Sequence, residues 1–312
     1  MTSVIRGVAA TGPVSGTVRG GRRLRLSPWR RPWGLEAFTW LYIAWSVVPV
    51  ALAVMFSFNS GGSQQSWQGF SFKWYTGNSV QSVLNNPELH ESVIQTLKLA
   101  GLTMLITVPL GVALAIGIDR WRSRTSDGLN MVIILSFVIP ELLLAVALFM
   151  MFTQLFKGIG LGTAAEVGGL VVWNLSWPAV IVRARLVTIG RTYEEAAADL
   201  GASRLGAIWR VLLPMLMPAI FASATLVFAS TVDDFVIVEQ LSSTASTQPM
   251  SVLIYGNVHG GGVNGPALNA LATIMLCFSL LMAGVGFVAY RWTTRGERNQ
   301  GATEALAGIA GI

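Results

Sequence analysis

The sequence predicts an all-α integral membrane protein with six membrane-spanning helices. Its 312 residues are 53% hydrophobic and only 12% charged, whereas soluble domains carry about 25% charged residues. Several apolar runs reach the roughly 20 residues that a helix needs to cross a bilayer. Because the hydrocarbon interior offers no hydrogen bonds to the backbone, each of these runs should fold as a helix.

Six apolar runs are long enough to serve as spans, with ends defined to about four residues. They cover residues 37–58, 92–118, 129–153, 167–187, 212–238 and 268–291. Five of the runs contain a proline, and each proline should mark a kink in its helix. These prolines are Pro49, Pro109, Pro140, Pro178 and Pro218.

Basic residues indicate how the bundle is oriented. Arginines precede the first span and follow the second, fourth and sixth: Arg6, Arg19, Arg22, Arg23, Arg25, Arg30, Arg31, Arg120, Arg122, Arg124, Arg191, Arg204, Arg210, Arg295 and Arg298. The opposite side carries little beyond Lys73 and Lys157. By the positive-inside rule, both termini and the loop 188–211 should lie in the cytoplasm. This topology explains the net charge of +6 without nucleic-acid binding.

The chain divides into three parts by composition. Residues 1–34 should form a mobile basic cytoplasmic arm, 35–292 the transmembrane domain, and 293–312 a flexible cytoplasmic tail. Two longer segments should face outward. Segment 59–91 is rich in aromatic residues, which suit either a protein partner or the headgroup layer of the membrane. Segment 239–267 ends in a run of glycines that predicts flexibility.

The loop 188–211 contains the most informative motif, Glu195-Ala196-Ala197-x3-Gly201-x9-Val211-x-Leu213-Pro214. A short helix should begin near Thr192, which can cap it, and its first turn holds acidic residues where the helix dipole favours negative charge. Gly201 should end this helix at positive φ. A second short helix over 203–212 should then lie against the membrane. Such a compact helix suits docking onto a partner, although an ordinary cytoplasmic loop remains the alternative.

The spacing of this motif closely resembles the EAA signature of permease subunits in ATP-binding-cassette importers. The resemblance implies that six residues contact an ATPase subunit: Glu195, Ala196, Ala197, Gly201, Leu213 and Pro214. It also implies the type I importer fold of the methionine and molybdate systems, in the bacterial plasma membrane. In that family the partners are an ATPase dimer, a second permease subunit and an extracytoplasmic substrate-binding protein. Only Val211 departs from the signature, replacing a more usual isoleucine.

The chain carries no sequence for ATP hydrolysis. Its lysines are Lys73, Lys98 and Lys157, and none follows a glycine, so a G-x-x-x-x-G-K-[ST] motif is impossible. ATP should therefore be used by a partner subunit, and this chain should be neither an enzyme nor a cofactor-binding protein. His90 and His259 lie in separate segments without a cluster of ligands, so no metal site is expected.

Further segments look like the permeases of spermidine/putrescine importers, over roughly residues 35–292. The similarity is greatest to the second of that system's two unlike permease subunits. The matching segments are Phe72-Lys73-Trp74-Tyr75, Pro140-Glu141, Ala198-Asp199-Leu200-Gly201-Ala202-Ser203, Asp233-Asp234 and Asn269-Ala270-Leu271-Ala272-Thr273. The resemblance implies a polyamine cargo. A permease for another small solute, such as an iron complex, thiamine, an opine or sulfate, is the alternative within this class. A motor-free channel or secondary transporter is the alternative outside it.

Three carboxylates inside the spans are candidates for the substrate path: Glu141, Asp233 and Asp234. A charged side chain at the centre of a spanning helix costs about 2.5–3.5 kcal/mol, so it usually faces protein or water and has a function. A continuous helix would point Asp233 and Asp234 about 100° apart, with Ser230 between their two faces. Helix packing, or a position nearer the outer interface, is the alternative role for these acids.

Aromatic residues of the fourth span complete the candidate path. Trp173 and Trp177 are four residues apart and should share a helix face, with Asn174 beside them. Aromatic faces bind cations, so Trp173 and Asn174 are expected to line the path of a polycation.

Overall fold

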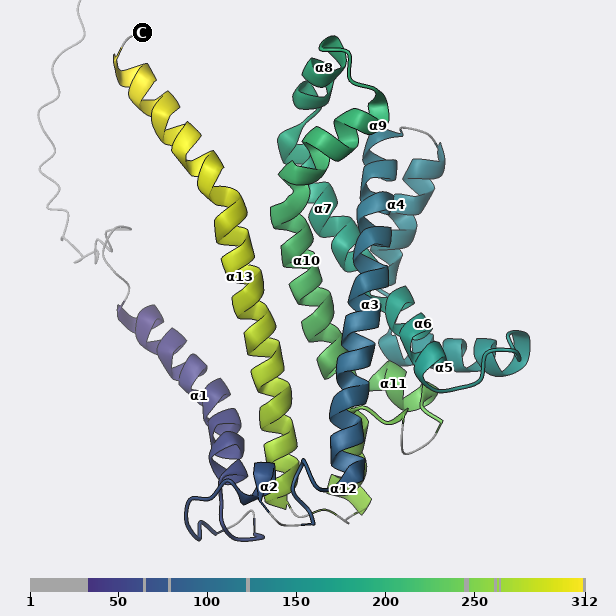
Figure 1. Ribbon diagram of the computed structural model, residues 1–312, viewed down its shortest axis with the longest axis vertical. Coiled ribbons are helices and arrows are strands. Elements are labelled where there is room, and N and C mark those ends of the chain that lie inside the picture. Colours follow the sequence, from purple (N-terminus) through teal and green to yellow (C-terminus); the bar gives the residue numbers. More distant parts are fainter. Residues whose placement is uncertain are drawn as a thin grey trace, which may run out of the picture. The chain divides into compact units, whose positions relative to one another are not determined.

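The structure is a computed structural model that describes residues 33–63, 66–77, 80–121, 124–243, 247–260, 263 and 265–310, the last 18 of these by their backbone alone (Figure 1). Most of the basic arm predicted over 1–34 lies outside the described residues, as do Arg122 and the glycine pair 261–262. Within the described ranges the chain forms helices and one isolated β-bridge, between Asn59 and Phe70. The all-α prediction is therefore confirmed.

Five helical segments are long and apolar enough to cross a membrane, and a sixth candidate is a bent helix pair. The first is α1 (Trp33–Ser57), which corresponds to the predicted span 37–58. Contacts divide the chain into two compact units, residues 1–49 and 50–312. α1 crosses this division, and everything described below belongs to the second unit.

The second span is α3 (Pro87–Arg120), the helix around which this unit is built. Its start is set by the sequence Asn-Pro-Glu. The Asn86 side chain accepts a hydrogen bond from the Glu88 amide at 3.0 Å, and Pro87 occupies the first turn, where a missing N–H costs nothing. In Figure 1, α3 runs from an end where α2 (Lys73–Thr76) and α12 (Met250–Gly260) lie to an end where α8 (Thr192–Asp199) lies. These are called the α12 end and the α8 end.

The third span differs from the prediction. Instead of one kinked helix over 129–153, α4 (Arg124–Ser136) stops, and α5 (Glu141–Met150) leaves at 108° to it. Pro140 accounts for the break, because proline disfavours the helical conformation at the residue before it and cannot donate a backbone hydrogen bond. A π-helical turn, η1 (Met151–Leu155), continues α5.

The fourth span consists of α6 (Thr163–Asn174) and α7 (Ser176–Ile189), joined through Leu175 in helical conformation. α7 approaches α3 closely at Gly111. A Cβ atom at this position would lie 2.4 Å from Cγ of Pro178 and 3.1 Å from the amide nitrogen of Ala179. Glycine is therefore required for the packing of these two helices.

The fifth span begins earlier and ends earlier than predicted. α9 (Arg204–Ala207), a π-turn η2 (Ile208–Leu212) and α10 (Leu213–Asp233) form one helical run. The predicted helix over 203–212 is therefore present as α9 and η2, but it is not separate, because it continues into α10. A helix that continues to residue 238 is also wrong, because the chain breaks at Asp234 and resumes as α11 (Val236–Leu241).

The segment predicted to be flexible, 239–267, contains the helix α12 (Met250–Gly260), which includes Gly256. The sixth span is α13 (Gly265–Ala310). α13 runs on through most of the predicted tail, so the backbone of 293–310 is helical, whereas the sequence favours a flexible segment.

Three groups of buried side chains hold the second unit together. One joins α3, α7 and α10 through residues such as Val112, Leu186 and Leu216. A second joins α5, α6 and α11 through Leu148, Leu170 and Leu241. The third lies at the α12 end, where Trp74, Leu89, Met250, Leu253 and Leu271 are buried.

Candidate functional site

The motif at the α8 end forms a short exposed helix, α8 (Thr192–Asp199), which buries none of its residues. Thr192 is the first helical residue and Arg191 flanks the helix without a side-chain cap, so the predicted capping by Thr192 is wrong. The prediction for Gly201 is confirmed, because its φ is +86°. The amides of Gly201 and Ala202 close the turn on the carbonyl groups of Ala198 and Ala197, each at 2.9 Å, as is typical of a glycine helix end.

The six predicted ATPase-contacting residues fall into two groups. Glu195, Ala196 and Gly201 are exposed and Ala197 is half-buried, so this group forms an accessible surface on α8. Leu213 and Pro214 instead begin α10, and Leu213 packs against the buried cluster of α3, α7 and α10. Leu213 and Pro214 thus begin the span, and contact of any of the six residues with an ATPase stays a prediction.

Asp233 is the last residue of α10 and lines a cavity of about 900 Å³ between α10, α12 and α13. Most of its lining is apolar. The other polar and aromatic side chains around it are Trp177, Ser230, Phe235, Ser251, Tyr255, His259 and Ser279. The ring of Tyr255 contacts those of Phe235 and His259, with centroids 4.6 and 4.2 Å away. A carboxylate, hydroxyl groups and aromatic faces thus share one cavity.

Asp234 lies at the helix break and is only 7% exposed. Its Oδ1 accepts hydrogen bonds from the amides of Ile237 and Val238 at 3.2 and 3.4 Å, and its carbonyl accepts one from Ser251 Oγ at 2.6 Å. Asp234 therefore caps α11 and joins it to α12. The predicted geometry, with both acids on one continuous helix, is wrong, because α10 ends at Asp233 and Asp234 is in extended conformation.

Glu141 is the first residue of α5, and its carboxyl group lies close enough to that of Asp234 for their charges to interact. Two carboxylates repel each other at this distance unless a proton or a cation lies between them. The structure thus brings Glu141 and Asp234 together, whereas Asp233 faces the cavity.

Trp173 and Asn174 do not line the cavity. Trp173 packs against the cluster of α5, α6 and α11. Asn174 is fully buried. Its amide nitrogen donates to the carbonyl of Leu170 at 3.0 Å, and its Oδ1 has no hydrogen-bond partner among the described residues. Trp177 does line the cavity and meets Phe137 edge-on at 4.9 Å. In this structure, then, the tryptophan one turn further along the helix reaches the cavity.

The sequence analysis missed three residues of this cavity, Ser251, Tyr255 and His259, all on α12. The glycines in 239–267 predicted a flexible segment, so the helix α12 was not predicted. Spacing was the available signal, because positions 251, 255 and 259 recur every four residues and share one helix face. Among the residues that the structure describes, no group of three or more His, Cys, Asp or Glu side chains is placed to hold a metal ion.

An exposed helix between two spans, together with a charged cavity among spanning helices, defines a membrane permease. The chain belongs to the family of binding-protein-dependent transport system inner membrane components, whose family model matches residues 107–299. It is therefore the permease subunit of an ATP-binding-cassette importer and a multi-pass inner-membrane protein.

Two relatives cover most of the chain. It is 33% identical over 282 residues to the putrescine transport system permease protein PotI of Escherichia coli strain K12, covering 88% of this chain and 94% of that protein. It is 30% identical over 254 residues to the spermidine/putrescine transport system permease protein PotC of the same strain, covering 81% and 92%. Both relatives are transport permeases, not enzymes.

A solved structure of the methionine ABC transporter MetNI, in an inward-facing conformation, matches the fold. The TM-score is 0.53 at 21% identity, and the match covers 66% of this chain and 94% of that one. The predicted type I importer fold is confirmed.

Proposed function

We propose that this permease forms half of the path by which a polyamine such as putrescine or spermidine enters the cell. The observation that carries the proposal is the cavity of about 900 Å³ in which Asp233 lies with Trp177 and Tyr255. A polyamine joins ammonium groups by methylene chains. A carboxylate pairs with an ammonium group. Aromatic faces bind cations, and apolar walls pack against methylene chains. The names of both relatives support the same cargo.

The partners in this proposal are an ATPase dimer, a second permease subunit and an extracytoplasmic substrate-binding protein. The second permease would close the open side of the cavity. Both termini and α8 would face the cytoplasm, as the distribution of arginines favours. A fluorescent protein fused to the C-terminus tests this orientation, because it should fluoresce only if that terminus is cytoplasmic.

Coupling would occur at α8. Its exposed surface, with Glu195, Ala196 and Gly201, would contact the ATPase subunit, and closure of the ATPase dimer would move α8. The helical run from α9 through η2 into α10 follows α8, so movement of α8 would pass along this run into α10 and the Asp233 cavity.

The Glu141–Asp234 pair would contribute a second attraction for a cation. Because two adjacent carboxyl groups need a proton or a cation between them, an ammonium group that reaches them would replace a proton. Asp234 of this pair is the sequence neighbour of Asp233 at the helix break, so a cargo with several ammonium groups would have more than one point of attachment.

The experiment is uptake of radiolabelled spermidine and putrescine by the complete complex in proteoliposomes, with Asp233→Asn and its matched control Glu91→Gln. Glu91 is an exposed carboxylate on α3 and does not line the cavity. Loss of a charged contact should lower uptake by Asp233→Asn about tenfold or more, with Glu91→Gln unchanged. A complex that hydrolyses ATP but imports neither amine would redirect the search to other solutes. Uptake that persists without ATP would identify a channel or secondary transporter.

A further inference from the structure

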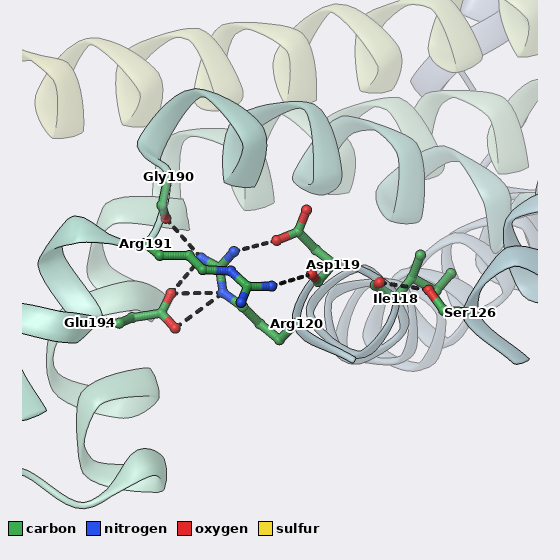
Figure 2. Close-up of polar contacts among 7 residues, drawn as sticks. All are labelled: Ile118, Asp119, Arg120, Ser126, Gly190, Arg191 and Glu194. Carbon is green, nitrogen blue, oxygen red and sulfur yellow. Dashed lines mark hydrogen bonds and ion pairs between the residues drawn. The ribbon is translucent and has the colours of Figure 1, made fainter. Parts of the chain in front are cut away.

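The last turn of α3 meets the start of α8 in a network of polar contacts (Figure 2). Arg120 Nε donates to Glu194 Oε1 and Oε2 at 2.9 and 3.1 Å. Arg120 Nη2 also donates to the carbonyl of Gly190 at 3.0 Å, and Nη1 pairs with Asp119. One guanidinium group thus joins the end of α3, the end of α7 and the first turn of α8.

A second contact joins α3 to the start of α8, with the donor beside α8 and the acceptor on α3. Arg191, which flanks α8, donates through Nη2 to the carbonyl of Asp119 at 3.1 Å. Between the two contacts lies Gly190, whose φ of +71° makes the corner from α7 into α8. This arrangement, which Figure 2 shows from one side, is called the α3–α8 clasp, and its residues are Asp119, Arg120, Gly190, Arg191 and Glu194.

The clasp is well placed to hold. The side chains of Arg120 and Glu194 are only 16% and 20% exposed, so water screens their attraction less than at a fully exposed pair. Arg120 lies at the carbonyl ends of α3 and α7, and Glu194 lies at the amide end of α8. Both charges therefore also favour the dipoles of the helices they contact.

Apolar packing contributes little at this corner. α8 has no buried residue, and the corner borders a cavity of about 780 Å³ that is lined by Asp119, Arg120, Gly190 and Arg191 among others. The direction of α8 relative to α3 is therefore set chiefly by polar contacts.

Two neighbouring glutamates in α8 have different surroundings. Adjacent helical residues point about 100° apart; Glu194 points back to α3, and Glu195 is exposed. We propose that Arg120 and Glu194 are positioning residues, which fix α8 to α3 so that a displacement of the Glu195 surface reaches α3 directly. α3 would then be a second route of transmission, in addition to the run from α9 into α10. This inference rests on the proposed coupling role of α8.

The test uses the complete complex with its ATPase and binding protein, reconstituted in proteoliposomes. The variants are Glu194→Gln, Arg120→Gln and the double substitution, with Arg124→Gln as control, because Arg124 is an exposed arginine at the same end. Two quantities are measured: putrescine imported per ATP hydrolysed, and amide hydrogen exchange in 192–200.

Each single variant should exchange faster in 192–200 and import about tenfold less putrescine per ATP, a size usual for coupling between sites. The double variant should lose no more import per ATP than either single variant, because the two residues act through each other. Unchanged exchange in α8 would overturn the clasp. Faster exchange with normal import per ATP would overturn its role in transmission.

The control for the underlying function is Glu195→Lys. If this substitution leaves ATP-driven import unchanged, the coupling role of α8 itself fails. If Glu195→Lys abolishes import but the clasp variants leave import per ATP unchanged, only the inference about Arg120 and Glu194 fails.

Discussion

The corner at Gly190 and the break at Asp234 are both places where a helical run stops and charged side chains gather, but the charges differ in sign. At the corner, Arg120 and Glu194 are opposite charges that satisfy each other. At the break, Glu141 and Asp234 are like groups placed side by side. The first arrangement holds elements together by attraction, whereas repulsion between the second pair of carboxyl groups is relieved by a proton or a cation. The comparison separates a joint that we propose transmits movement from a site that we propose attracts a ligand.

The largest effect is expected at Glu195, which lies on the exposed surface of α8 and belongs to neither charge pair. Glu195→Lys should lower ATP-driven uptake by about 100-fold, because it places a positive charge where a carboxylate is expected to meet the ATPase. Uptake by proteoliposomes and the amount of inserted protein are the measurements. Near-normal uptake by Glu195→Lys would contradict the proposed coupling role of α8 and leave only a structural difference between the corner and the break.

An intermediate effect is expected at the break, where the two roles of Asp234 can be separated. Asp234→Ala removes the acceptor for the amides of Ile237 and Val238 and should cost about 1–2 kcal/mol of stability. Asp234→Asn keeps an acceptor for those amides and can donate to Glu141, so it should retain the stability of the wild type.

Thermal unfolding of the purified complex, followed by tryptophan fluorescence, measures the difference between the two Asp234 variants. Equal stability of the Ala and Asn variants would mean that the cap is unimportant. If Asp234→Asn is stable but imports less polyamine, the pair acts on the cargo in addition to capping α11.

The smallest effect is expected at the end of α8. Gly201→Ala forces a side chain into positive φ and should cost about 1 kcal/mol locally, although no atom lies within 4 Å of the new Cβ. Gly128→Ala is the matched control, since Gly128 is helical and equally uncrowded. Hydrogen exchange in 192–200 should rise in the first variant and not in the second. Equal exchange in the two variants would show that the clasp, and not the turn at Gly201, holds α8 in place.

The sequence predicted the helices well where one physical signal dominates. Apolar length identified the spans, and the acidic turn and glycine around α8 identified a short helix with its end at Gly201. The predictions failed in two ways. Asp234 leaves the helix because its carboxylate caps α11, a local signal that the charge-based prediction overlooked. α12 forms because Met250 and Leu253 are buried against α13, a tertiary contact that local sequence does not show.

The candidate site was predicted in part for the same reason. Charge in an apolar run singled out Glu141, Asp233 and Asp234, but only a structure could separate the cavity residue from the buried pair. Trp173 and Trp177 are equivalent by spacing, and packing against α5 and α11 distinguishes them. The clasp joins residues more than 70 positions apart, so no local pattern could have identified it.

The contact between Gly111 and Pro178 limits how the transport cycle can proceed. Because even one methyl group would collide there, α3 and α7 are in close contact at this point and cannot move closer together. A rearrangement that keeps this contact moves the two helices as a single body, with rotation concentrated at their ends. An importer built in this way would change its access by rigid rocking, and a covalent cross-link between α3 and α7 midway along their length should leave its transport cycle intact.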